Sequence, residues 1–146
     1  MFSSGTIYSN FTPLVKSPVI GYRISGSDVL DILKKLTKRN FSKDHSVIKV
    51  VELYNYNGDI LDKCSVVYFK SPKSFTGEDV CEIFLHGSPL IASQLEQTLK
   101  NFNIPGLRLA KNGEFSFRSV LNSKNSLKQA KAINAIISNE SFSALE

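Results

Sequence analysis

Residues 47–69 read VIKVVELYNYNGDILDKCSVVYF, two apolar, strand-like segments on either side of Asn57-Gly58. Asn-Gly between such segments is the strongest short-range signal for a β-hairpin, because both positions of its two-residue turn need a positive φ. The stretch therefore predicts a long antiparallel hairpin with its turn at Asn57-Gly58. A hairpin of this length indicates that the fold is built on a largely antiparallel sheet.

The rest of the chain adds shorter elements around this hairpin. Strands are expected at 5–11, 19–26, 80–86 and 107–110, and helices at 27–38, 88–102, 115–121 and from Ser126 onwards. Ser27 and Ser88 are the expected caps of the first two helices, with Pro89 in the first turn of the second. The order of these elements predicts an α+β fold with a mixed or antiparallel sheet and packed helices.

The chain has 146 residues, which suits one compact unit of ordinary size. Its longest apolar runs are a few residues, far short of the ~20 that cross a bilayer. The first residues, MFSSGTIYSNF, lack the basic start and continuous apolar segment of a secretory signal. We therefore expect an intracellular, cytoplasmic protein without a membrane span.

The two cysteines, Cys64 and Cys81, lie in strand-like segments without CxxC spacing or neighbouring histidines. This pattern favours buried free thiols over a zinc site, and no metal site is expected. The formal net charge is +5, and basic residues gather in the last third: Arg108, Lys111, Arg118, Lys124, Lys128 and Lys131. A solvated face is favoured there over a nucleic-acid footprint, and both readings stay open.

Three carboxylates occur in residues 74–87, SFTGEDVCEIFLHG. Glu78 and Asp79 are expected to be solvated loop acids that cap or form turns. Glu82, by contrast, lies between Cys81 and Ile83 in an apolar strand, where an unpaired carboxylate would be costly. It needs a partner: backbone N–H groups, Arg23 in the apolar strand YRISG, or a bound ligand.

The sequence offers no complete catalytic constellation. His86 stands where a strand meets a helix, and a role in capping or packing is favoured over general acid–base chemistry. Neither GxxxxGK[ST] nor GxGxxG occurs, so nucleotide chemistry is not expected from this chain. We therefore assign no catalytic residues.

Several motifs resemble one family, in order and at its spacing. They are RISG (23–26), SFTGEDVCEI (74–83), HG (86–87), IPGLRLA (104–110), GEFSFR (113–118) and LNSK (121–124). Together they resemble the N-terminal domain of the tRNA modification GTPase family MnmE, also called TrmE, over nearly the whole chain.

The resemblance implies a fold similar to the tetrahydrofolate-binding domain of one-carbon enzymes. It also implies binding of 5-formyl-tetrahydrofolate, homodimerisation, and work with an MnmG-type partner on the wobble uridine (U34) of tRNA. The folate contacts of the family fall on Arg23, Glu82 and Lys124. Residues 1–122 then correspond to the folate-binding domain and 123–146 to the start of a truncated helical domain.

The chain departs from the family at a Gly-rich turn, where it has Val15, Ser17 and Pro18. The GTPase domain is also absent, so GTP hydrolysis is not expected here and a separately encoded GTPase half is one possibility. The leading interpretation is a folate-binding, dimerising module that supplies a one-carbon donor site. The alternatives are an interaction fragment that has lost folate binding, and a stand-alone one-carbon transferase, which the lack of acid–base groups disfavours.

Overall fold

The computed structural model describes residues 5–123 and Lys131. In chain order the elements are β1 (Ile7–Asn10), β2 (Val19–Ser25), α1 (Val29–Thr37), β3 (Ile48–Tyr54), β4 (Ile60–Phe69), β5 (Val80–His86), α2 (Pro89–Asn101), β6 (Arg108–Leu109) and α3 (Glu114–Leu121). The predicted α+β class is confirmed. The helix predicted from Ser126 onwards lies outside the described residues.

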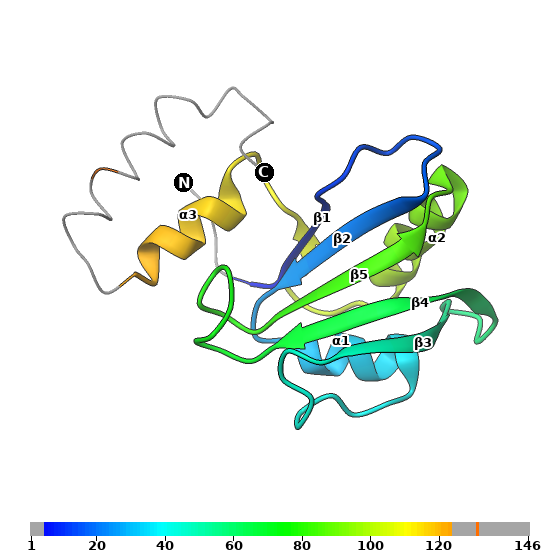
Figure 1. Cartoon of the computed structure of the whole chain (residues 1–146), viewed down its shortest axis with the longest axis horizontal. Helices are drawn as coiled ribbons and strands as arrows, with labels where there is room; N and C mark the ends of the chain where they lie inside the picture. The colour runs from blue at the N-terminus through cyan, green and yellow to red at the C-terminus, as the bar shows by residue number, and fades with distance from the viewer. Residues whose placement is uncertain (1–4, 124–130, 132–146) are drawn as a thin grey trace.

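The sheet has the strand order β3-β4-β5-β2-β1-β6. Neighbouring strands are antiparallel, except that β6 runs parallel to β1. In Figure 1, α1 and α2 lie against one face of this sheet, and α3 lies beyond one end of it. None of the described helices combines the length and the apolar character of a bilayer-crossing segment.

The predicted hairpin is formed by β3 and β4, but its turn differs from the prediction. Gly58 has φ 85°, whereas Asn57 is not among the residues with positive φ. The N–H of Gly58 donates to the carbonyl of Asn55 at 2.9 Å, and the N–H of Asn55 donates to the carbonyl of Asp59 at 2.8 Å. The loop is therefore a three-residue turn closed by a glycine in the left-handed region, instead of a two-residue turn at Asn57-Gly58.

The Asn55 side chain supplies the physical reason for this longer turn. Its Oδ1 accepts hydrogen bonds from the N–H groups of Asn57 and Asp59 at 2.9 and 3.0 Å. An Asn side chain that binds the backbone two residues ahead stabilises a local turn of its own. The hairpin keeps its length, and only Gly58 needs a positive φ.

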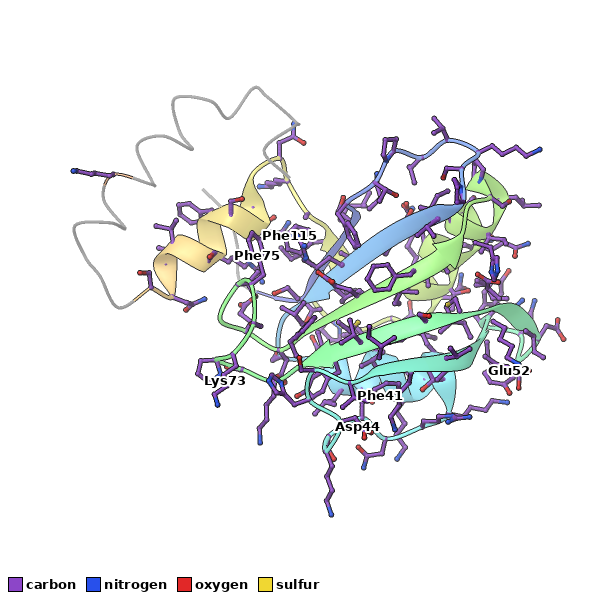
Figure 2. All side chains as sticks on the ribbon, in the orientation of Figure 1. Phe41, Asp44, Glu52, Lys73, Phe75 and Phe115 are labelled. Carbon is purple, nitrogen blue, oxygen red and sulfur yellow. The ribbon has the colours of Figure 1, made fainter. Side chains whose placement is uncertain are left out.

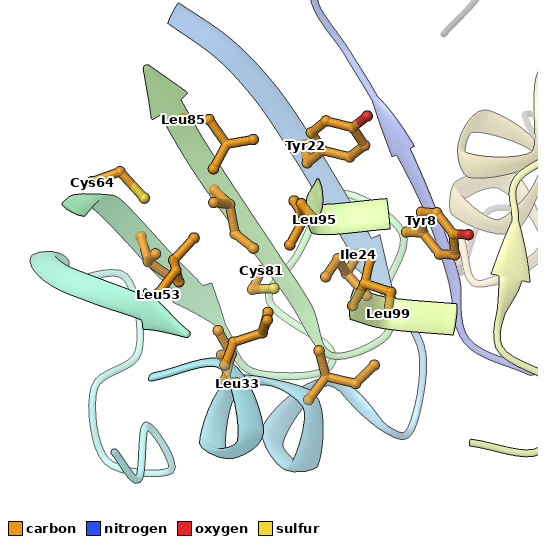
Figure 3. Packing of buried hydrophobic residues seen from close by; sticks show 14 of the residues in the cluster. Tyr8, Tyr22, Ile24, Leu33, Leu53, Cys64, Cys81, Leu85, Leu95 and Leu99 are labelled. Atoms are coloured by element: carbon orange, nitrogen blue, oxygen red, sulfur yellow. The ribbon is translucent and has the colours of Figure 1, made fainter. Parts of the chain in front are cut away.

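The core lies between the sheet and the two helices α1 and α2 (Figure 3). Alternate residues of each strand face it, because successive side chains of a strand point to opposite faces. Cys64 and Cys81 are buried and free, as predicted. Burial raises the pKa of the Cys64 thiol to about 12 and also raises that of Cys81. Both thiols are therefore held in the protonated form.

The caps of the two helices differ in how well the sequence predicts them. Ser88 caps α2 through a hydrogen bond from the Ile91 N–H at 3.4 Å, and Pro89 begins the helix, as predicted. Ser27 is not the cap of α1, because Asp28 occupies that position. The Asp28 carboxylate accepts a hydrogen bond from the Thr6 hydroxyl at 2.8 Å, so it ties β1 to the start of α1 instead of capping the helix.

Candidate functional site

Arg23 and Glu82 face away from the core, on the sheet face that α1 and α2 leave open. The register of β2 and β5 sets the two residues directly opposite each other. Their neighbours Tyr22, Ile24 and Ile83 point the other way and are fully buried. Side-chain alternation and strand pairing therefore bring together two charges that lie far apart in the sequence.

The two charges form an ion pair that uses only part of the carboxylate. Nε and one terminal nitrogen of Arg23 donate to Oε2 of Glu82 at 3.1 and 3.0 Å. The side chains are 15% and 19% exposed. No hydrogen bond to the other oxygen, Oε1, comes from any described residue. Glu82 is therefore neutralised by Arg23 and keeps one oxygen available as an acceptor.

Three phenyl rings surround the Arg23 guanidinium. Its central carbon lies 5.1 Å from the ring centroid of Phe11, 4.6 Å from that of Phe75 and 5.6 Å from that of Phe115. Figure 2 shows Phe75 and Phe115 close together between α3 and the loop that precedes β5. Cation–π attraction holds the guanidinium in place and gives the ion pair an aromatic wall.

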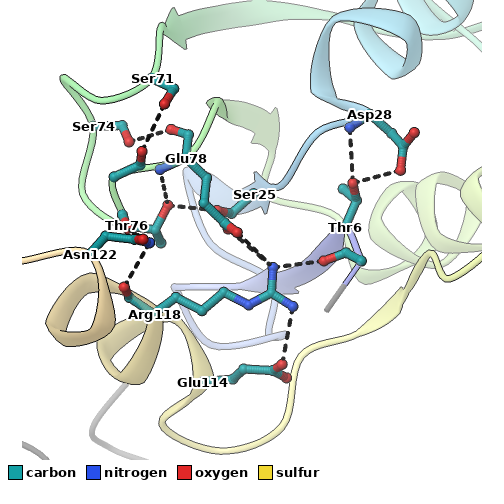
Figure 4. Close-up of polar contacts among 12 residues, drawn as sticks. Thr6, Ser25, Asp28, Ser71, Ser74, Thr76, Glu78, Glu114, Arg118 and Asn122 are labelled. Atoms are coloured by element: carbon teal, nitrogen blue, oxygen red, sulfur yellow. Dashed lines mark hydrogen bonds and ion pairs between the residues drawn. The ribbon is translucent and has the colours of Figure 1, made fainter. Parts of the chain in front are cut away.

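Glu78 corrects the prediction of a solvated loop acid. Its Oε1 accepts a hydrogen bond from the Ser25 hydroxyl at 2.7 Å and pairs with Arg118 at 3.1 Å. Arg118, on α3, is itself buried and also donates to the Gly5 carbonyl at 2.7 Å. Figure 4 shows how these contacts join α3, the loop before β5 and the start of β1.

Glu114 is the second acid of this network, and it is 0% exposed. Two nitrogens of Arg108 donate to it at 2.8 and 2.6 Å, the Lys111 N–H at 2.9 Å and Arg118 at 3.3 Å. Burial alone would raise the pKa of Glu114. The hydrogen bonds from Arg108 and the Lys111 N–H, with the charges of Arg108 and Arg118, hold that pKa below its ordinary value. Glu114 is therefore a buried carboxylate held in its charged form.

A protein-family model described as GTP-binding protein TrmE N-terminus matches residues 6–124. The chain belongs to this family. Residues 6–124 include both members of the Arg23–Glu82 pair and the whole of α3. The match therefore covers the site as well as the fold.

Individual relatives of the TrmE N-terminal family agree with this assignment. The tRNA modification GTPase MnmE of Helicobacter pylori (strain Shi470) is 45% identical over 141 residues, which are 96% of this chain and 30% of that protein. The tRNA modification GTPase MnmE of Rickettsia canadensis (strain McKiel) is 41% identical over 137 residues, 94% of this chain and 30% of that protein. The chain thus spans about 30% of the length of these curated relatives.

Within this TrmE N-terminal chain, the structure brings together Arg23 and Glu82 of the three predicted folate contacts. The third, Lys124, lies outside the described residues. Two hollows, of about 420 and 300 Å³, lie elsewhere, beside Glu96 and beside His86. Neither of them is lined by Arg23 or Glu82. The pair therefore lies outside both hollows, mostly buried behind the three phenyl rings.

Asp79 has the turn-forming role expected for it, whereas His86 is exposed and neither caps a helix nor packs in the core. Asp79 accepts hydrogen bonds from the Tyr68 hydroxyl at 3.2 Å and the Ser71 N–H at 2.9 Å, which shape the loop. His86 pairs through Nδ1 with Asp62 at 2.9 Å at the end of β5. Among the described residues, no group of three or more metal-ligating side chains comes together.

The predicted basic concentration in the last third is reduced by the network around α3. Arg118 is buried, and both Arg108 and Arg118 are paired with Glu114. Lys131 is exposed, and Lys124 and Lys128 lie outside the described residues. Two of the six predicted basic residues therefore serve internal pairing. These two residues therefore belong neither to a solvated face nor to a nucleic-acid footprint.

Sequence reasoning missed five residues that shape the site: Phe11, Phe75, Glu114, Phe115 and Arg118. Glu114 and Arg118 are four residues apart, which was the available signal for a pair on one helix face, but the predicted helix began one residue after Glu114. Phe75 had no such signal, because its place beside Arg23 depends on the fold of the loop before β5.

Proposed function

We propose that this chain is the folate-binding and homodimerising module of a tRNA wobble-uridine modification system. In this proposal it binds 5-formyl-tetrahydrofolate, works in the cytoplasm, supplies the one-carbon donor site and performs no catalysis alone. One observation carries the proposal: Glu82 is mostly buried beside an aromatic wall and still has an oxygen that no described residue uses. Membership of the TrmE N-terminal family supports it.

The chemistry of the ligand matches that oxygen. A pterin presents an amino group and a ring N–H side by side, and a carboxylate accepts hydrogen bonds from such donors. The other end of a folate is a glutamate with two carboxylates, which suits a cation. In this proposal Glu82 binds the pterin edge, Arg23 stays paired with Glu82 and serves the formyl group, and Lys124 serves the tail or the formyl group.

The departures from the family at Ser17 and Pro18 lie at the other end of β2. The N–H of Ser17 donates to the carbonyl of Gly87 at 3.0 Å, and Pro18 lines the hollow beside His86. Arg23 and Glu82 pair farther along the same two strands. The changed residues therefore lie away from the Arg23–Glu82 pair, which supports a pterin contact at that pair.

A second candidate function is an interaction module without folate binding. The observation that favours it is the ion pair itself, because Arg23 already neutralises Glu82 without a ligand. A structural ion pair of this kind needs no further partner. Ligand titration separates the two candidates.

We expect 5-formyl-tetrahydrofolate to bind the chain with a Kd of about 1 µM or lower, since a ligand of this size reaches such affinity with a few well-placed polar contacts. Glu82→Ala should lose this binding, because the acceptor for the pterin edge is gone. Isothermal titration calorimetry measures both. The matched control is Glu52→Ala on β3, an exposed acid away from the pair, which should bind as the wild type does. Equal binding by Glu82→Ala would contradict the assigned role.

The partners of the whole system are part of the same proposal. We propose residues 1–122 as the folate-binding domain, similar in fold to that of one-carbon enzymes, and 123–146 as the start of a helical domain. An MnmG-type partner, tRNA and a GTPase domain, on the same polypeptide or encoded separately, would complete the reaction. The names of the relatives support this assignment.

Homodimerisation is supported by apolar side chains on the open face of the sheet. Ile48 and Val50 of β3 and Val19 of β2 are exposed there. We expect sedimentation velocity to give a dimer at tens of micromolar chain, and Val50→Lys to shift it toward monomer by placing a charge in the contact. Leu90→Lys is the matched control, because Leu90 is equally exposed but lies on α2. A monomeric wild type would contradict this part of the proposal.

A further inference from the structure

Phe75 is a large apolar side chain that stays 49% exposed although it lies beside a mostly buried ion pair. It belongs to the loop between β4 and β5, and its ring centroid lies 4.6 Å from the central carbon of the Arg23 guanidinium. Its neighbour in the aromatic wall, Phe115, is buried. Phe75 is therefore the ring of this wall that offers the most surface to a ligand.

The exposure of Phe75 does not come from a loosely packed loop. The next residue, Thr76, is fully buried, and its hydroxyl lies 2.7 Å from that of Ser25. The Thr76 carbonyl accepts a hydrogen bond from the Asn122 side chain at 2.7 Å, at the end of α3. The Ser71 hydroxyl donates to the Gly77 carbonyl at 2.9 Å. Contacts on both sides of Phe75 thus fix the backbone that presents its ring (Figure 4).

The Arg23 side chain shows which kind of chemical group can contact both Phe75 and Glu82. Its guanidinium is flat, carries N–H donors in its plane, lies near the Phe75 ring and donates to Glu82. In the position of Arg23, a planar group with adjacent N–H donors thus reaches a Glu82 oxygen and lies near the phenyl ring. An aliphatic or tetrahedral group satisfies the carboxylate but gains no stacking.

We propose that Phe75 is a specificity-determining residue, whose ring selects a flat heteroaromatic group that donates to Oε1 of Glu82. This inference rests on the proposed function, and it assigns the pterin ring, and not the glutamate tail, to the exposed part of the Phe75 ring beside Oε1 of Glu82, next to the Arg23 guanidinium. Arg23 keeps its hydrogen bonds to Oε2. Arg118 and Asn122 act as positioning residues, because they hold the loop that carries Phe75.

The first test uses the absence of tryptophan from the chain. Phe75→Trp introduces one fluorescent reporter at the proposed stacking position, and Tyr56→Trp introduces one at another half-exposed aromatic position, in the β3–β4 turn. Adding 5-formyl-tetrahydrofolate should quench the reporter at Phe75, because a stacked ring contacts the indole. The fluorescence of the tryptophan at position 56 should fall only by the amount that the absorbance of the ligand accounts for. Equal changes at both positions would overturn the proposal.

The second test measures affinity by calorimetry. Phe75→Leu should weaken binding of 5-formyl-tetrahydrofolate about tenfold or more, because the stacking surface is lost. Phe75→Tyr keeps the ring and should bind as the wild type does, which a purely apolar packing role does not require. Urea denaturation checks that both variants stay folded. Undiminished affinity in Phe75→Leu would overturn the role of Phe75 alone, whereas a wild type that binds no ligand would overturn the proposed function as well.

Discussion

Glu114→Gln should lower the free energy of unfolding by about 3–5 kcal/mol, the cost of removing one partner from a buried ion pair. The carboxylate is fully buried and accepts hydrogen bonds from Arg108, Arg118 and the Lys111 N–H. The neutral amide keeps the shape but removes the carboxylate charge that faces both Arg108 and Arg118, although Arg118 still pairs with Glu78. Urea denaturation of the two proteins at about pH 7 measures the difference.

The control for this prediction is Glu52→Gln, an exposed acid on β3, which should change stability by less than about 0.5 kcal/mol. Acidification gives a second readout. Because the folded pKa of Glu114 is lowered, its contribution is complete above the ordinary value of 4.5 and disappears as the pH falls through the folded pKa. The difference in the free energy of unfolding between the wild type and Glu114→Gln should therefore become smaller below pH 4.5. If this difference in the free energy of unfolding did not change with pH, Glu114 would not be charged in the folded protein.

Gly26→Ala should lower the free energy of unfolding by about 3 kcal/mol or more, from backbone strain and overpacking together. Gly26 ends the RISG segment with φ +145°, and an added Cβ would lie 2.4 Å from Oγ1 and 2.6 Å from Cα of Thr6. The Cα belongs to the backbone at the start of β1, so a side-chain rotation does not relieve the contact. Thermal or urea denaturation measures the loss.

Gly58→Ala is the matched control for Gly26→Ala. Gly58 also has a positive φ, +85°, but no atom lies within 4 Å of the added Cβ. Only the cost of the left-handed conformation applies there, about 1 kcal/mol. If the two substitutions destabilised the protein equally, the close approach of Thr6 to Gly26 would not matter for stability.

The sequence predicted most elements of the fold because their signals are local. The start of α2 follows from a capping serine, Ser88, that is directly followed by a proline, Pro89. The β3–β4 hairpin follows from Asn57-Gly58 between two apolar segments, although the turn type was wrong. That error has a physical cause: the Asn55 side chain reorganises the loop, and propensity at the two central positions does not reveal it.

The candidate site was predictable only in part, because local sequence patterns do not determine which distant strands pair or in which register. Arg23 and Glu82 were recognised singly, as charges in apolar strands, and Arg23 was one of three partners considered for Glu82. The register of β2 and β5 makes Arg23 the partner of Oε2 and leaves Oε1 for a ligand in the proposed function. Glu78 was misassigned for the same reason, since its partner Arg118 lies on a helix that meets the loop only in the folded protein.

The central claim is that this chain binds a reduced folate at Glu82, and titration of 5-formyl-tetrahydrofolate into the wild-type chain tests it most directly. We expect saturable heat with one ligand per chain and a Kd of about 1 µM or lower. The Oε1 atom that no described residue uses is the reason for this expectation. No saturable heat at ligand concentrations of about 100 µM would contradict the claim, since an affinity that weak is inconsistent with a dedicated donor site.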